Sequence, residues 1–182
     1  MMKSIGFLEF NSIARGIEAT DTMIKAAAVD LIFSKPTCPG KFITLIAGDV
    51  AAIKASMEAG RACGSIYVVD YLVIPRVDPQ VIYAINGVAP VENFNALGIL
   101  EFFSVVGAVT AADAAVKAAE VNLIEVRLGV GIGGKSFVTL TGDVSGVEAA
   151  VEAGAANGID NGLLVNKAVI SSPRKELYDN LL

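Results

Sequence analysis

The chain carries the same sequence pattern twice, and this internal duplication constrains its fold more than any other feature. Residues 5–33 read IGFLEFNSIARGIEATDTMIKAAAVDLIF, and residues 97–125 read LGILEFFSVVGAVTAADAAVKAAEVNLIE. Because each copy has the length of a small domain, we predict two domains of the same fold, at residues 1–90 and 91–182. The stretch at residues 87–95, which contains Gly, Pro and two Asn residues, is the predicted linker.

Each copy has the pattern expected for the order strand, helix, strand, strand, helix, strand. In the first copy we expect strands at residues 5–10, 31–34, 42–47 and 67–74, and helices at residues 12–28, 49–64 and 78–85. Ser12 and Asp49 are N-cap residue types at the starts of the two long helices. Apolar residues recur at helical spacing along the first helix: Ile13, Ile17, Ile24 and Ala28. The βαββαβ order predicts an α+β fold, a tandem repeat of two ferredoxin-like domains with helices on an antiparallel sheet.

Composition argues against several functions. Lys and Arg total 14 against 19 Asp and Glu, the net charge is −5 and no basic run occurs, so no nucleic-acid partner is expected. The apolar runs are shorter than the roughly 20 residues of a membrane-spanning helix, and the N-terminus lacks the features of a signal peptide. These observations predict a cytoplasmic protein with no membrane partner. The chain has no His, which removes the commonest general base. We therefore assign no catalytic residues and expect that the protein is not an enzyme.

The repeated motifs resemble a known family. The pattern IGFLEF…ATDTMIKAAAVDLI followed by GDVAAI…AG, and its second copy LGILEF…AADAAVKAAEVNLI and GDVSGV…AG, resembles the bacterial microcompartment shell domain over nearly the whole chain. Two copies in one chain imply the tandem class, in which three chains form a pseudohexamer that tiles into a shell facet. The stretch SKPTCPGKF most resembles the iron–sulfur members of propanediol-utilisation shells. The resemblance thus implies a homotrimer in a microcompartment shell, with other shell proteins as partners and encapsulated enzymes as possible partners.

The resemblance also implies roles for particular residues. In the similar proteins, the cysteine that matches Cys38 is thought to hold an iron–sulfur cluster on the trimer axis. Three such thiolates can bind three irons of a 4Fe–4S cluster that the three chains share, for electron or cluster transfer. The positions that match the loops lining the central pore are Pro36, Thr37, Pro39, Gly40, Gly131, Ile132, Gly133 and Gly134. The tile-edge positions are Lys25, Lys117 and Arg76. The second copy departs from the edge motif, because it has Ser-Ser-Pro-Arg at residues 171–174.

Other interpretations stay open. Cys38 can be an incidental loop thiol, the central opening can be a metal-free metabolite pore, and the fold also suits a ferredoxin-like small-molecule sensor domain. Cys63 is expected to be a small, buried apolar residue. Residues 129–134 match G-x-G-x-x-G, but a strand and not a helix is predicted to follow, which argues against dinucleotide binding. Glu9 and Glu101 occupy the same position of the repeat, so duplication explains the pair and predicts a structural role.

Overall fold

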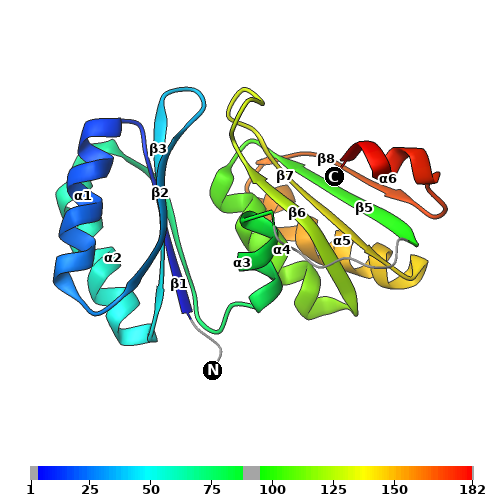
Figure 1. Ribbon diagram of the computed structural model, residues 1–182, viewed down its shortest axis with the longest axis horizontal. Coiled ribbons are helices and arrows are strands. Elements are labelled where there is room, and N and C mark those ends of the chain that lie inside the picture. The colour runs from blue at the N-terminus through cyan, green and yellow to red at the C-terminus, as the bar shows by residue number, and fades with distance from the viewer. Residues whose placement is uncertain (1–3, 88–94, 182) are drawn as a thin grey trace. The chain divides into compact units, whose positions relative to one another are not determined.

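The computed structural model describes residues 4–87 and 95–181, which group into two compact units. The first unit comprises the chain up to Val77 together with Gly129–Gly134, and the second comprises Asp78–Leu128 with the chain from Lys135 onward. The first unit contains β1 (Ser4–Phe10), α1 (Ile13–Ala26), β2 (Asp30–Thr37), β3 (Lys41–Gly48), α2 (Val50–Gly64), a short 3-10 turn (Ser65–Tyr67) and β4 (Val68–Ile74) (Figure 1). The second unit contains α3 (Pro79–Ile85), β5 (Ala96–Phe102), α4 (Val105–Ala118), β6 (Val121–Leu128), β7 (Ser136–Gly142), α5 (Val144–Asp160), β8 (Leu164–Ile170) and α6 (Lys175–Leu181). The predicted boundary between residues 90 and 91 lies outside the described residues and stays a prediction.

Both sheets have the same antiparallel topology. The strand order is β2-β3-β1-β4 in the first sheet and β6-β7-β5-β8 in the second. Even the irregularities repeat, because the pairing of the central strand with its edge strand shifts register between Glu9 and Phe10 and again between Glu101 and Phe102. The predicted α+β fold, with two ferredoxin-like βαββαβ domains in tandem, is confirmed. Within the described residues, no helix has the length and apolar character needed to cross a membrane.

The core of the first unit lies between the sheet and the two helices that cover one face of it, α1 and α2 (Figure 1). Its buried side chains come from both layers: Leu8, Phe10, Phe42 and Ile46 from the strands, and Ala19, Met23, Ile53 and Met57 from the helices. Gly60 of α2 packs closely against both the neighbouring helix and the sheet, since an added Cβ would lie 2.5 Å from Met23 Cγ and 2.8 Å from Leu8 Cδ1. Gly154 has the same place in the second copy, 2.8 Å from Leu100 Cδ1. Close packing therefore requires the repeated glycine.

The apolar stripe expected on the first helix exists, but it faces away from the sheet. Ile13, Ile17 and Ile24 are 42%, 56% and 42% exposed, and Ala28 lies beyond the end of α1. The face that α1 buries consists mostly of small residues: Gly16, Ala19, Thr20 and Met23. Small side chains allow α1 to approach β3, since a Cβ at Gly16 would lie 2.5 Å from the Phe42 ring. In the second copy, Val105 and Val109 occupy the positions of Ile13 and Ile17 and are buried.

We predict that Gly60→Ala destabilises the protein by about 1–3 kcal/mol, because the added methyl group overpacks the contact with Met23 and Leu8. The matched control is Gly146→Ala in α5, where the nearest atom would be 3.5 Å away. This control should be neutral or stabilising by about 0.4–1 kcal/mol, since alanine restricts the unfolded chain. Urea unfolding of both variants measures the difference, and equal stabilities would contradict the packing argument.

Candidate functional site

Cys38 lies in the tight connection between β2 and β3. Thr37 ends β2 and is buried, Lys41 begins β3, and the two residues are paired across the hairpin. The Gly40 N–H donates to the Thr37 carbonyl at 3.1 Å, and Gly40 has a φ of 84°, which favours glycine. Cys38 is partly exposed and forms no disulfide, and its peptide bond to Pro39 is cis. The hairpin therefore presents one free thiol at its tip.

The loop at Gly129–Gly134, which joins β6 to β7, lies against the Cys38 loop within the first unit. The Cys38 N–H donates to the Gly129 carbonyl at 3.2 Å. An added Cβ at Gly134 would lie 2.8 Å from Pro39 Cδ. The structure thus brings together residues that the sequence placed in two separate loops. Strand β7 follows this loop, so the G-x-G-x-x-G match opens no helix.

The middle of the glycine loop has a different environment from its ends. Gly131 and Gly133 have positive φ, are exposed, and have no neighbouring atom within 4 Å of an added Cβ. Ile132 between them is half-buried. Among the residues with described positions, no group of three or more Cys, Asp and Glu side chains lies close enough to hold a metal ion.

An ion pair stands at the base of each loop. The Lys41 Nζ donates to Glu9 Oε1 at 2.9 Å, and the Glu9 side chain is only 2% exposed. Burial raises the pKa of Glu9 above its ordinary value of 4.5, although the hydrogen bond and charge of Lys41 lower it. Lys135 pairs with Glu101 in the same way, in a more exposed setting. The two glutamates thus anchor the lysines that end the two loops. Sequence reasoning missed these partners, although the repeated Gly-Lys and Glu positions were available as a signal.

The predicted tile-edge residues are all exposed at their side chains. Lys25 donates to Asp21 at 2.5 Å, and both side chains are exposed. Lys117 donates to Asp113 at 2.5 Å, but this carboxylate is only 9% exposed. The remaining edge residue, Arg76, is also exposed and has a φ of 54°. Lys25 and Lys117 therefore lie in different environments, although they occupy the same position of the repeat.

Helix α3 covers the edge strand β6 in the second unit. The Gln80 side chain forms two hydrogen bonds with this strand: its Nε2 donates to the Val121 carbonyl at 3.3 Å, and its Oε1 accepts from the Leu123 N–H at 3.0 Å. Val81 and Ala84 of the helix are buried. Asp113 on α4 accepts a further hydrogen bond, from the Asp78 N–H at 3.0 Å. Sequence reasoning predicted this short helix but not the role of Gln80.

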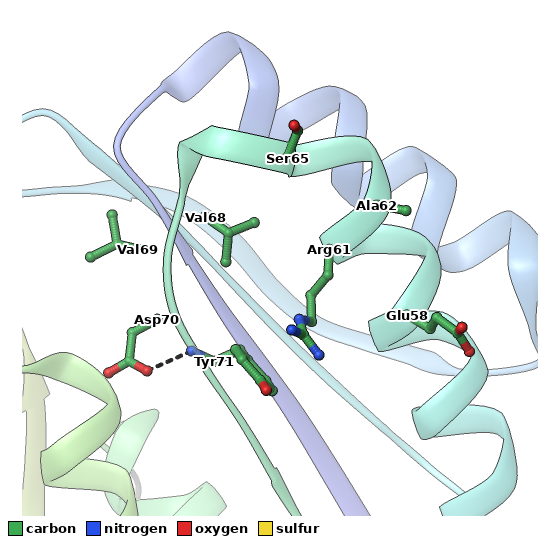
Figure 2. A pocket seen from close by; sticks show the side chains of 8 residues that line it. All are labelled: Glu58, Arg61, Ala62, Ser65, Val68, Val69, Asp70 and Tyr71. Atoms are coloured by element: carbon green, nitrogen blue, oxygen red, sulfur yellow. Dashed lines mark hydrogen bonds between the residues drawn. The ribbon is translucent and has the colours of Figure 1, made fainter.

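A surface hollow of about 530 Å³ lies beside β4, between the strand and the end of α2 (Figure 2). The Arg61 guanidinium carbon lies 3.8 Å from the centre of the Tyr71 ring, a cation–π contact. At the position of Tyr71 the second copy has Lys167, which pairs with Glu152 at 2.5 Å. The two copies thus use different interactions to fix the same corner of the fold.

Comparison with known proteins identifies the family. The chain belongs to the BMC domain family, whose pattern matches residues 4–77 and again residues 96–173, and it is a structural shell protein of a bacterial microcompartment. It is 41% identical over 182 residues to the microcompartment shell protein PduT of Citrobacter freundii, which covers 100% of this chain and 99% of PduT. The shell protein EutM of Salmonella typhimurium is 42% identical over 77 residues, which are 41% of this chain and 80% of EutM.

Solved structures agree with this assignment. A microcompartment protein from Desulfitobacterium hafniense has a TM-score of 0.92 and 52% sequence identity, over 98% of this chain and 99% of that one. The fused permuted hexameric shell protein MSM0275 has a TM-score of 0.60 at 23% identity, over 84% of this chain and 79% of its own, which shows a likeness of fold alone. The resemblance stated from the sequence motifs is therefore confirmed at the level of the tandem shell family.

We predict that Glu9→Gln changes how stability depends on pH. A carboxyl group whose pKa is raised on folding stabilises the protein fully below its unfolded value of 4.5, and this stabilisation is lost as the pH rises through the folded pKa. The stability of Glu9→Gln relative to the wild type should therefore increase as the pH rises from about 4.5. Lys41→Met removes the charge that lowers the pKa of Glu9, so the pH range over which this stabilisation is lost should extend to higher pH. Urea unfolding across a pH series tests both, and parallel profiles for wild type and Glu9→Gln would contradict the prediction.

Proposed function

We propose that three copies of the chain form a pseudohexameric tile of a cytoplasmic microcompartment shell. We further propose that three copies of Cys38 bind a 4Fe–4S cluster at the central pore of this trimer, for electron or cluster transfer. Other shell proteins would then be partners at the tile edges, and encapsulated enzymes would be partners on one face. The observation that supports the trimer is a difference between the two copies: one helix–strand face is covered by a further helix, whereas the equivalent face exposes large apolar side chains.

The covered face lies in the second unit. There α3 packs against β6 and α4, and Gln80 bonds the backbone of the edge strand. The equivalent face of the first unit consists of α1 and β2, where Ile13, Ile17 and Ile24 are exposed. A stripe of large apolar side chains on a helix favours burial against a partner.

Helix α6 has the right place in the repeat to cover that apolar face in another copy. It follows β8 as α3 follows β4, and the strand register aligns Ile74 with Ile170. By the same alignment Val81 corresponds to Leu177, which is 38% exposed whereas Val81 is fully buried. Tyr178 of α6 is buried against its own sheet, beside Leu97 and Ile124. Leu177 is thus an exposed apolar side chain that can contact a neighbouring chain.

A contact between α6 of one chain and the α1–β2 face of the next is heterologous, so it generates either a closed ring or a filament. Each chain supplies two copies of one domain, so the proposed trimer is a closed ring of six domains in which the two copies alternate. The contact would not be identical to the one inside the chain, because Glu176 stands at the position of Gln80. A carboxylate accepts from an edge-strand N–H but cannot donate to a carbonyl.

The residues around Cys38 suit a cluster shared between chains. The thiol is free and partly exposed at the tip of a hairpin, and Pro36 and Pro39 restrict the backbone on either side. One thiolate cannot hold a cluster, but three related by a threefold axis can bind three of four irons, and the fourth iron would take a small exogenous ligand. When bound, such a cluster supplies one-electron chemistry. The role of this chain would be to hold it at the opening.

A metal-free metabolite pore is the second candidate. It is favoured by the open surroundings of Gly131 and Gly133, whose backbone borders unfilled space. The sensor interpretation has less support, since the relatives named above are shell proteins.

We predict that Ile17→Lys and Leu177→Lys each convert the assembled protein into smaller species. Burying one such side chain stabilises an interface by about 1.5–3 kcal/mol, and a charge in its place removes this gain at every interface of the ring. The matched control is Ile159→Lys, which replaces an isoleucine of similar exposure, 54%, at the end of α5. Analytical ultracentrifugation should find a trimer for the wild type and for the control. Trimers in all three variants would exclude the proposed interface.

We predict that Cys38→Ser abolishes iron binding and leaves the trimer intact. After anaerobic purification or reconstitution, iron and sulfide are assayed per chain, and the wild type should hold close to four irons per three chains. Cys63→Ser is the matched control, because Cys63 packs against the core and should not affect iron. Iron retained in Cys38→Ser would exclude the cluster site. A trimer without iron in the wild type would instead favour the metabolite pore.

A further inference from the structure

The loop that supports Cys38 comes from the other copy of the repeat. The Cys38 N–H donates to the carbonyl of Gly129 at 3.2 Å, which ties the cysteine backbone to the start of the glycine loop. At the far end of that loop, a Cβ on Gly134 would lie 3.1 Å from the Cys38 carbonyl oxygen. The second copy has no cysteine of its own. Its loop therefore contacts the thiol-bearing segment without presenting a thiol.

The four positive-φ glycines of this loop divide into two pairs. All have φ between 66° and 82°, so glycine is favoured at each for its backbone conformation. Gly129 and Gly134 have a second constraint, since an added Cβ would lie 2.5 Å from Thr37 Oγ1 and 2.8 Å from Pro39 Cδ, respectively. Gly131 and Gly133 have no neighbour within 4 Å. The first pair is needed for the close approach of the two loops, and the second pair only for the local turn.

We propose that Gly129 and Gly134 are positioning residues for Cys38: their lack of side chains lets the second copy's loop hold the Cys38 loop in one conformation. The inference rests on the proposed role of Cys38 at the pore, to which it adds the residues that fix where the thiol points. Because the Cys38 amide donates to Gly129 and there is no room for a side chain between Gly134 and the Cys38 carbonyl, displacement of the glycine loop frees the thiol-bearing segment.

The test compares alkylation rates of the two cysteines in the purified, metal-free protein. Wild type, Gly129→Ala, Gly134→Ala, Gly131→Ala and Gly133→Ala are treated with iodoacetamide, and each cysteine is followed by peptide mass spectrometry. Overpacking by one methyl group is enough to change a local opening equilibrium by about tenfold. Cys38 should therefore react about tenfold faster in Gly129→Ala and Gly134→Ala than in the two matched controls, which have the same backbone strain without the clash.

Cys63 serves as an internal reference, because it packs against the core of the first unit. A variant that merely unfolds would accelerate both cysteines, whereas loss of positioning accelerates Cys38 alone. Equal Cys38 rates in all four alanine variants would overturn the proposal.

A rescue experiment separates the clash from any other effect of Gly129→Ala. In the background of Gly129→Ala, Thr37→Ala removes the atom that an added Cβ would meet at 2.5 Å and leaves Thr37 Cβ at 3.7 Å. Thr37→Val also removes the hydroxyl but keeps an atom of similar size at that place. The first double variant should return the Cys38 rate to that of Thr37→Ala alone, and the second should stay fast. Rescue by both or by neither would overturn the assignment of Gly129.

The alkylation pattern does not depend on iron, so the two proposals fail separately. A wild-type protein that binds no iron but shows the glycine pattern would exclude the cluster and keep the positioning role. A wild-type protein that binds iron through Cys38 but shows no difference among the glycine variants would support the cluster and exclude the positioning role.

Discussion

The close contact of the helices with one face of the sheet is the constraint on which the rest of this structure depends. It requires residues with little or no side chain: Gly60 against Leu8 and Met23, and Gly16 against the Phe42 ring. Because α1 uses its small residues to approach the sheet, its isoleucines must face the other way. The packing that stabilises the unit therefore also creates an apolar surface that a single chain leaves open. The same placement of small and large residues along α1 thus stabilises the unit and exposes the apolar stripe through which we propose that it assembles.

The two copies keep this arrangement with different core chemistry. In the first unit, Thr20 Oγ1 hydrogen-bonds Thr44 Oγ1 at 2.6 Å and the Gly16 carbonyl at 2.7 Å, with Ser34 beside them. The positions of these hydroxyl groups are taken in the second copy by Ala112, Val126 and Val138. A buried hydroxyl is tolerated when it is hydrogen-bonded, and an apolar group needs no partner. Each copy fills these three positions in its own way, so the duplicated sequences could diverge here without a change of topology.

Much of the fold was predictable from the sequence because its signals are local. Strand and helix order, the N-cap at Ser12, and the hairpin that carries Cys38 follow from periodicity, turn residues and the repeat itself. What the sequence could not provide was the direction in which a periodic stripe faces, since Ile13, Ile17 and Ile24 satisfy the spacing of a core face while lying outside it. The partners of Gln80, Glu9 and Gly129 were also missed. Each joins positions far apart in the chain, and no local pattern encodes such a distance.

The inequality of the two hairpin loops has a consequence for stoichiometry. Cys38 in the first loop corresponds to Ile132 in the second, which is two residues longer. A ring of six identical single domains would place six thiols around its axis, twice the number that a site of threefold symmetry can use. Fusing two domains into one chain makes alternate positions independent, so that one copy keeps a reactive group and the other becomes a scaffold for it. In the proposed trimer, gene duplication thus lowers the symmetry of the opening from sixfold to threefold, while the tile still consists of six similar domains.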